Sequence, residues 1–181
     1  MATIWLTYAW EDNRNQDVDY VAQELIRAGV NVRLDRWAIG AGLRLWEQIE
    51  NFIMNPSESD GWLLYATANS LGSEPCKEEF SFALLRALET RGTTFPVIGL
   101  FPSPIDHGLI PASIRNRLYV STTDPDWKER IVAATEGRQP NIARHEIQPY
   151  FLEVHQLGEN QFAIEVRPRA GVWRPFLAEY P

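Results

Sequence analysis

Short apolar segments alternate with amphipathic ones along the first 135 residues, and this order constrains the fold more than any other feature of the sequence. The short segments are rich in β-branched and aromatic residues, as strands are, and the amphipathic segments repeat apolar residues at helical spacing. Strands that alternate with helices over short connections predict a parallel sheet with right-handed crossovers and helices on both faces. The expected strands are residues 3–8, 30–34, 61–66, 95–101 and 118–121, and the expected helices are residues 17–28, 45–53, 76–89 and 126–135.

Three loops of this α/β pattern share one edge of the expected sheet. They follow Leu6, Leu34 and Ala66, where the first three strands end. Ligands of parallel sheets collect outside the carboxyl ends of the strands. We therefore expect a binding site at this edge, with irregular loops over residues 35–42 and 67–75.

Composition and charge exclude several classes of function. The formal net charge of −7 gives no basic field for a phosphate backbone, so we expect no direct binding to nucleic acid. The sequence begins with no signal-peptide pattern and has no apolar run long enough to span a bilayer, so we expect neither secretion nor membrane embedding. A single cysteine, Cys76, excludes an intrachain disulfide and is typical of the cytoplasm. The three histidines are scattered, and we expect no metal site.

The pattern changes after the last expected helix. Residues 137–140 are typical of a linker, and two β patterns, residues 150–155 and 161–166, flank a hairpin turn beyond it. We expect a first domain over residues 1–136, and over residues 137–181 a linker and β-rich extension that packs on the first domain or begins a second one. Its aromatic and arginine side chains favour a regulatory or partner-binding role: Arg167, Arg169, Trp173, Arg174, Phe176 and Tyr180.

Three segments, in order, resemble motifs of the TIR (Toll/interleukin-1 receptor) domain family. Residues 4–12 resemble the family's opening strand with its Ser-Tyr and acidic turn, with Thr7 in the serine position. Residues 29–49 resemble the second strand, the long loop after it and the next helix. Residues 70–80 resemble the serine-rich turn followed by Cys, two variable residues, Glu and a large apolar residue. The resemblance implies a flavodoxin-like TIR domain.

Many TIR domains hydrolyse or cyclise NAD⁺ with a glutamate of the third segment, and the resemblance implies the same chemistry here. The family's spacing assigns that role to Glu79, and Glu78 is the rival candidate. Adjacent helical positions diverge by about 100°, so only one of the two can face a pocket. Glu79 lies in register with Ala83 of the expected buried stripe, which favours Glu79. NAD⁺ is then the substrate, and no cofactor is expected.

Other candidate ligand contacts lie on loops at the same edge of the sheet. Trp10 is a candidate to stack on nicotinamide or adenine, although core packing is the ordinary role of a tryptophan. Gly40 lies in a loop where a missing Cβ allows a ligand to approach the main chain, and Asp35 ends a strand where α/β sites gather. The complete set of expected binding residues is Tyr8, Ala9, Trp10, Asp35, Gly40 and Trp46.

The resemblance implies two kinds of function. One is an NAD⁺ nucleosidase of bacterial antiviral defence, switched on when TIR units self-associate through a partner protein or a sensor domain; hydrolysis, cyclisation and base exchange all remain open. The other is a non-enzymatic interaction or adaptor module, because residues 36–46 carry tryptophans and leucines suited to a protein interface. A phospho-accepting receiver is disfavoured, because the third expected strand ends in Tyr65-Ala66-Thr67 and lacks an aspartate there.

Overall fold

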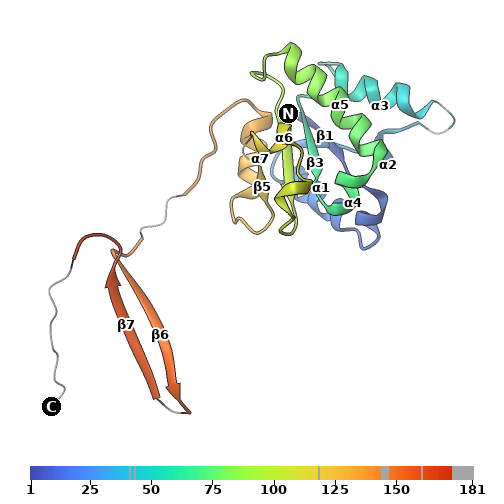
Figure 1. Ribbon diagram of the computed structural model, residues 1–181. Helices are drawn as coiled ribbons and strands as arrows, with labels where there is room; N and C mark the ends of the chain where they lie inside the picture. The colour runs from blue at the N-terminus through green and yellow to red at the C-terminus, as the bar shows by residue number, and fades with distance from the viewer. Residues whose placement is uncertain (41, 43, 118, 144–146, 160, 173–181) are drawn as a thin grey trace, which may run out of the picture. The chain divides into compact units, whose positions relative to one another are not determined.

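The computed structural model describes residues 1–40, 42, 44–117, 119–143, 147–159 and 161–172 of the chain. The chain divides into two compact units, Met1–Ile142 and Ala143–Pro181. The first unit is an α/β domain and the second contains a β-hairpin (Figure 1).

The sheet of the first unit consists of β1 (Thr3–Thr7), β2 (Asn31–Arg33), β3 (Gly61–Tyr65), β4 (Val97–Phe101) and β5 (Val120–Ser121). All neighbouring strands are parallel, and their order is β2-β1-β3-β4-β5. This is the order of flavodoxin-like doubly wound sheets, so the predicted α/β fold is confirmed. Leu118, the expected start of the last strand, lies outside the described residues.

The helical segments are η1 (Trp10–Asn13), α1 (Asp17–Arg27), α2 (Asp35–Ala38), α3 (Leu45–Met54), α4 (Ala68–Gly72), α5 (Glu74–Glu89), η2 (His107–Leu109), α6 (Ala112–Arg115) and α7 (Trp127–Thr135). The prediction of irregular loops over residues 35–42 and 67–75 was wrong in part, because these segments contain α2 and α4. Helices of four or five residues are too short to show helical periodicity. Among the described helices, none combines the length and apolarity that crossing a membrane requires.

Successive side chains of β1 point to opposite faces of the sheet, and each face has its own core. Ile4 and Leu6 pack in the cluster that includes α1 and α7, whereas Trp5 packs in the cluster that includes α3 and α5. The ring of Trp5 stacks on Phe52 of α3 with 5.2 Å between centroids. Because Thr7 follows Trp5 by two residues, its side chain points to the same face, under α5.

Arg86 of α5 is buried in the core, which the sequence did not predict. Its guanidinium donates to the carbonyl of Ile53 in α3 and to both the carbonyl and the hydroxyl of Ser59. It also lies over the ring of Phe95, 3.9 Å from the centroid. These contacts satisfy the buried charge and join α5 to the carboxyl end of α3, which lies beside it (Figure 1).

The second unit is built on β6 (Tyr150–Gly158) and β7 (Gln161–Pro168), an antiparallel hairpin whose strands run longer than the sequence predicted. One face of the hairpin is apolar, with Leu152 opposite Val166 and Val154 opposite Ile164. Two strands alone cannot cover such a face, so it requires a further surface. Of the predicted partner-binding set, Trp173, Arg174, Phe176 and Tyr180 lie outside the described residues.

Candidate functional site

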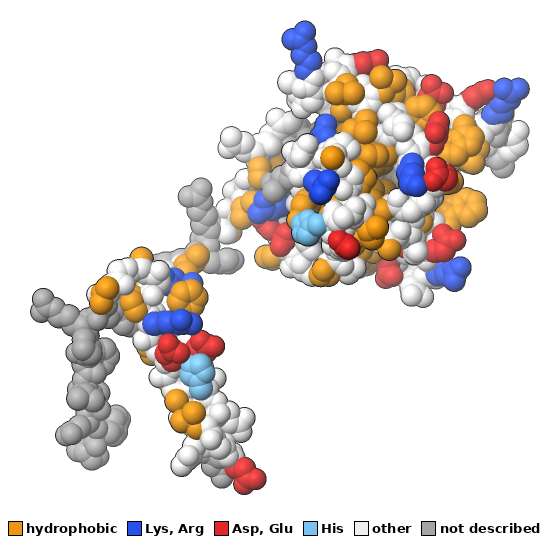
Figure 2. Space-filling view, in the orientation of Figure 1, with side chains coloured by type: hydrophobic (Ala, Val, Ile, Leu, Met, Phe, Trp, Pro, Cys, Tyr) orange, Lys and Arg blue, Asp and Glu red, His pale blue; other side chains and the backbone are white. Residues whose placement is uncertain are grey.

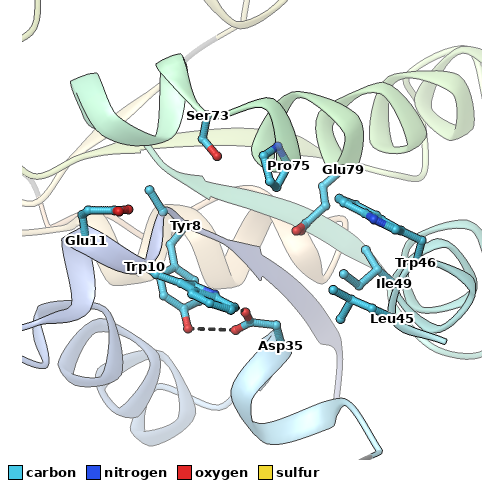
Figure 3. A pocket seen from close by; sticks show the side chains of 11 residues that line it. Tyr8, Trp10, Glu11, Asp35, Leu45, Trp46, Ile49, Ser73, Pro75 and Glu79 are labelled. Carbon is cyan, nitrogen blue, oxygen red and sulfur yellow. Dashed lines mark hydrogen bonds between the residues drawn. The ribbon is translucent and has the colours of Figure 1, made fainter. Parts of the chain in front are cut away.

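A pocket of about 360 Å³ lies beyond the carboxyl ends of β1 and β2, bounded by α2, α3 and the start of α5 (Figure 3). The strand order reverses at β1, and doubly wound sheets bind ligands outside the strands at such a point. Six of the residues that the sequence singled out line this pocket, although they come from four separate segments of the chain. They are Tyr8, Ala9, Trp10, Asp35, Trp46 and Glu79.

Glu79 extends from α5 into the pocket, and β1 holds its carboxylate from one side (Figure 3). The residue is only 9% exposed. Its Oε2 accepts a hydrogen bond from Trp5 Nε1 at 2.7 Å and another from Thr7 Oγ1 at 2.5 Å. Within the described part of the chain, no group donates to Oε1. One oxygen is therefore fixed by the protein and the other is left for a ligand.

The environment of Glu79 raises its pKa to about 7 from the ordinary 4.5. Burial is the main cause, and the negative charge of Asp35 adds to it. The hydrogen bonds from Thr7 and Trp5 act in the opposite direction, because they stabilise the ionised form. The carboxyl group therefore changes protonation near neutral pH, the range in which a carboxyl group serves catalysis best.

Glu78 has a different environment, although it is the next residue of the same helix. Its side chain is exposed, and it borders a shallow surface depression with Trp46, Glu74 and Pro75. Glu79 instead lies on the buried side of α5 with Cys76 and Ala83. The structure thus places Glu79, and not Glu78, among the residues that line the pocket.

Asp35 faces the same pocket from α2, and its two oxygens are already in use. Oδ1 accepts from the Tyr8 hydroxyl at 2.8 Å and from the Arg36 amide at 2.7 Å, and Oδ2 accepts from Trp10 Nε1 at 2.7 Å. Burial, followed by the hydrogen bond to Asp35, raises the pKa of Tyr8, so this phenol stays protonated and donates. Asp35 therefore fixes two aromatic side chains of the segment after β1.

Trp10 and Trp46 present large uncovered surfaces at the pocket. Trp10 is 72% exposed and Trp46 is 40% exposed. Figure 3 shows the two indoles on either side of the Glu79 carboxylate. Neither ring is buried in the core, the ordinary role of tryptophan, and both have the flat apolar faces on which an aromatic base can stack.

Gly40 does not line the pocket, unlike the other expected site residues. Its amide donates to Gln48 Oε1 at 2.9 Å, which ties this part of the loop to α3. Gly42 adopts a φ of +80°, a conformation that glycine tolerates without strain. The neighbouring Ala41 and Leu43 lie outside the described residues.

Other pocket residues were not predicted. Ser73 caps the start of α5 and lines the pocket beside Pro75, and a serine two residues before a proline is a recognisable sign of a helix start. Leu45 and Ile49 of α3 form an apolar part of the wall. The contacts of Trp5 and Thr7 with Glu79 join residues more than 70 positions apart, and no local pattern reveals such a pair.

The hairpin of the second unit carries a separate cluster of polar side chains. Ligand atoms of Glu153, His155 and Glu165 lie within 4.8 Å of one another, a proximity that spacing along the sequence does not reveal. The guanidinium of Arg167 lies 3.2 Å from Glu153 and 3.7 Å from Glu165, and it offsets their charge. Figure 2 shows acidic, basic and histidine side chains together on the hairpin. These contacts form an exposed ion-pair network, and the same three side chains, Glu153, His155 and Glu165, offer ligand atoms close enough together to bind a metal ion.

Comparisons with known proteins agree with the architecture. Residues 4–134 match a family model described as a TIR domain. The chain is similar to the crystal structure of the TIR domain of the Toll-related receptor TRR-2 from the lower metazoan Hydra magnipapillata, with 15% identity, a TM-score of 0.60, and coverage of 75% of this chain and 99% of that one. It is also similar to TIR domains of the activated Roq1 resistosome that recognises the pathogen effector XopQ, with 19% identity, a TM-score of 0.46, and coverage of 57% and 60%. No curated protein matches the chain.

Proposed function

The chain belongs to the TIR domain family, and from this premise we propose that its first unit is an NAD⁺ nucleosidase that releases nicotinamide, with Glu79 as the catalytic residue. The remaining product is ADP-ribose after hydrolysis or cyclic ADP-ribose after cyclisation. NAD⁺ is the substrate in this proposal, and no cofactor takes part.

One observation carries the proposal. A nearly buried carboxylate, Glu79, offers a single unpaired oxygen to a pocket whose sides include two exposed indoles, Trp10 and Trp46. A nearly buried carboxylate held in place by the protein stabilises a positive charge that develops nearby. Flat aromatic surfaces suit a substrate that carries two aromatic bases.

The chemistry needs no more than one carboxylate. The bond between the nicotinamide nitrogen and C1′ of the ribose breaks, and nicotinamide leaves as a neutral base with the bonding electrons. The ribose becomes oxocarbenium-like, and Glu79 Oε1 stabilises this charge, as carboxylates do in glycoside cleavage. Water then adds to C1′ and loses one proton, which gives ADP-ribose, nicotinamide and H⁺. In cyclisation, a nitrogen of the substrate's own adenine adds in place of water.

We place this activity in bacterial antiviral defence and in the cytoplasm, with self-association of TIR units as its switch. Trp37 of α2 and Leu45 and Trp46 of α3 are each at least 40% exposed, as interface residues are, and the latter two line the pocket. A partner protein or a sensor domain would bring the units together. The single buried cysteine suits a reducing compartment.

The test is incubation of the protein with NAD⁺ over a range of protein concentrations, with and without a crowding agent. We expect release of free nicotinamide, with a rate per protein molecule that rises as light scattering reports assembly. Chromatography of the nucleotide product separates ADP-ribose from cyclic ADP-ribose. If the assembled protein releases no nicotinamide, the nucleosidase proposal is wrong.

The second candidate is a non-enzymatic adaptor, favoured by the same exposed group of Trp37, Leu45 and Trp46. An adaptor requires assembly but no carboxylate chemistry. The two candidates separate cleanly with Trp37→Ala and Glu79→Gln in one assay series. If the protein is an adaptor, Trp37→Ala loses partner binding and Glu79→Gln retains it. In that case neither the parent nor either variant consumes NAD⁺.

A further inference from the structure

The catalytic carboxylate proposed above is held by two side chains of a strand, and these were not among the expected site residues. Trp5 and Thr7 are neighbours on one face of β1, and each is only 1% exposed. Both donate to the same oxygen of Glu79, Oε2. Two donors on one oxygen fix the plane of the carboxylate and leave the other oxygen, Oε1, on the side of the pocket.

The donors are themselves held in place, so the arrangement exists before any ligand binds. The indole of Trp5 stacks on Phe52 with 14° between the ring planes. The guanidinium of Arg33 lies 5.1 Å from the centroid of the Phe52 ring. Thr7 belongs to an interior strand of the sheet, because β1 lies between β2 and β3, and it pairs with Leu64 of β3. Groups fixed in this way do not have to reorganise during a reaction.

We infer that Thr7 and Trp5 are positioning residues of the active site, which orient Glu79 and keep its carboxylate ionised while Oε1 faces the substrate. This inference rests on the proposed function where it is tested by the pH dependence of nicotinamide release, but not where it is tested by titration of Glu79 without NAD⁺.

The electrostatic argument follows from the groups around Glu79. Asp35 faces it from α2, and the Cys76 thiol lies three residues earlier on α5, where burial raises the pKa of that thiol to about 11 and so keeps it neutral. Tyr8 is neutral as well, for the reasons given above. Thr7 and Trp5 are therefore the groups that favour the charged form of Glu79, against burial and Asp35. Loss of either donor raises the pKa of Glu79.

The experiment compares Thr7→Val, which keeps the shape but removes the hydroxyl, with Thr7→Ser, which restores it. We expect the acid limb of the pH profile of nicotinamide release to move upward by about one pH unit or more in Thr7→Val, because hydrogen bonds to charged groups are strong. Activity should recover at high pH, and Thr7→Ser should return the profile toward that of the parent. Trp5→Phe should shift the limb in the same direction.

Thr135→Val is the matched control. Thr135 is also a buried threonine, but it donates to the Ile131 carbonyl within α7 and does not line the pocket. This variant also loses a buried hydroxyl and should leave the acid limb in place. If Thr7→Val lowers activity equally at every pH and Thr135→Val behaves alike, Thr7 is merely structural and the inference is wrong.

A titration without NAD⁺ keeps the inference separate from the proposed activity. The side-chain carboxyl of Glu79 is followed by ¹³C NMR against pH, with Glu79→Gln to assign the signal. We expect a midpoint near neutral pH in the parent and a higher one in Thr7→Val. If nicotinamide is never released but these midpoints differ as expected, only the proposed function fails; if the midpoints coincide, the positioning inference fails.

Discussion

The α5 side and the α2 side of the pocket each contribute one carboxylate, and the protein uses the two differently. Glu79 is buried, with one oxygen held by β1 and the other free. Asp35 accepts hydrogen bonds on both oxygens, from the Tyr8 hydroxyl, the Trp10 indole and the Arg36 amide. The two groups lie close enough for the charge of Asp35 to raise the pKa of Glu79.

This difference shows what a carboxylate can do at each place. A carboxylate whose acceptor positions are filled by its neighbours orients those neighbours. A nearly buried carboxylate with an open oxygen can act on a ligand, and it lowers the stability of the fold in return. We therefore assign chemistry to the α5 side and the shape of the pocket to the α2 side.

The largest expected effect comes from removing the charge on the α5 side. Glu79→Gln should reduce nicotinamide release by about a thousandfold or more, because the developing positive charge loses its fixed partner. The measurement is the rate of nicotinamide release at saturating NAD⁺.

The neighbouring variant Glu78→Gln is the control, since it removes one charge from the same helix at an exposed position. Its rate should match that of the parent. Equal losses in both variants would mean that the charge of the α5 surface matters and that the pocket position of Glu79 does not.

The Glu79→Gln variant also tests how burial of this carboxylate affects the stability of the fold. The pKa of Glu79 rises from 4.5 to about 7 on folding, so the folded state binds the proton more tightly and loses stability as pH rises through this window. This difference in pKa lowers the free energy of unfolding by about 3 kcal/mol above pH 7 and has no effect below pH 4. Glu79→Gln should therefore be more stable than the parent at pH 8 and equally stable at pH 4, measured by urea unfolding. A loss of stability at pH 8 would show that the carboxylate holds the fold together.

Trp10→Ala tests the surface that Asp35 orients. Loss of the exposed indole should raise KM for NAD⁺ about tenfold and change kcat less, because stacking of an aromatic ring on a base contributes about 1–3 kcal/mol. Steady-state kinetics separates the two constants. Trp10→Phe keeps an aromatic face and should have a smaller effect. An unchanged KM would exclude Trp10 from the binding site.

The smallest expected effect belongs to Asp35→Asn. The amide keeps one acceptor oxygen, so at least one of the three donors to Asp35, namely Tyr8, Trp10 and the Arg36 amide, loses its acceptor, and KM should rise by a few-fold, about one lost hydrogen bond. Because the charge of Asp35 raises the pKa of Glu79, its removal should move the acid limb of the profile downward. This direction is opposite to that expected for Thr7→Val. If Asp35→Asn loses as much activity as Glu79→Gln, the conclusion that only Glu79 takes part in the chemistry is wrong.

The sequence predicted the parallel sheet and the segments that meet at the pocket, because strands and long helices carry strong periodic patterns. It also favoured Glu79 over Glu78, and helical geometry explains why the two side chains have different surroundings in the structure. It missed α2 and α4, which are too short to show a period.

The contacts that define the chemistry of the pocket could not be predicted from the sequence. The bonds from Trp5 and Thr7 to Glu79, and from Tyr8 and Trp10 to Asp35, join residues that only the folded sheet brings together. Residue type alone would place all of these aromatic side chains in the core. The structure instead leaves Trp10 largely exposed at the pocket.

The buried Arg86 has a mechanical consequence for the pocket. It connects α5 to the end of α3 by one hydrogen bond to the Ile53 carbonyl, and to the segment after α3 by two hydrogen bonds to Ser59; α5 carries Glu79 and α3 carries Trp46. Breaking such a buried network is costly, so α3 and α5 should move as one rigid body. A ligand too large for the resting pocket must then enter by displacement of the α2 side, where, among the described residues, the hydrogen bond of the Trp10 ring goes to Asp35. The wall that moves to admit a ligand and the wall that carries the reacting carboxylate would thus be opposite each other in the pocket.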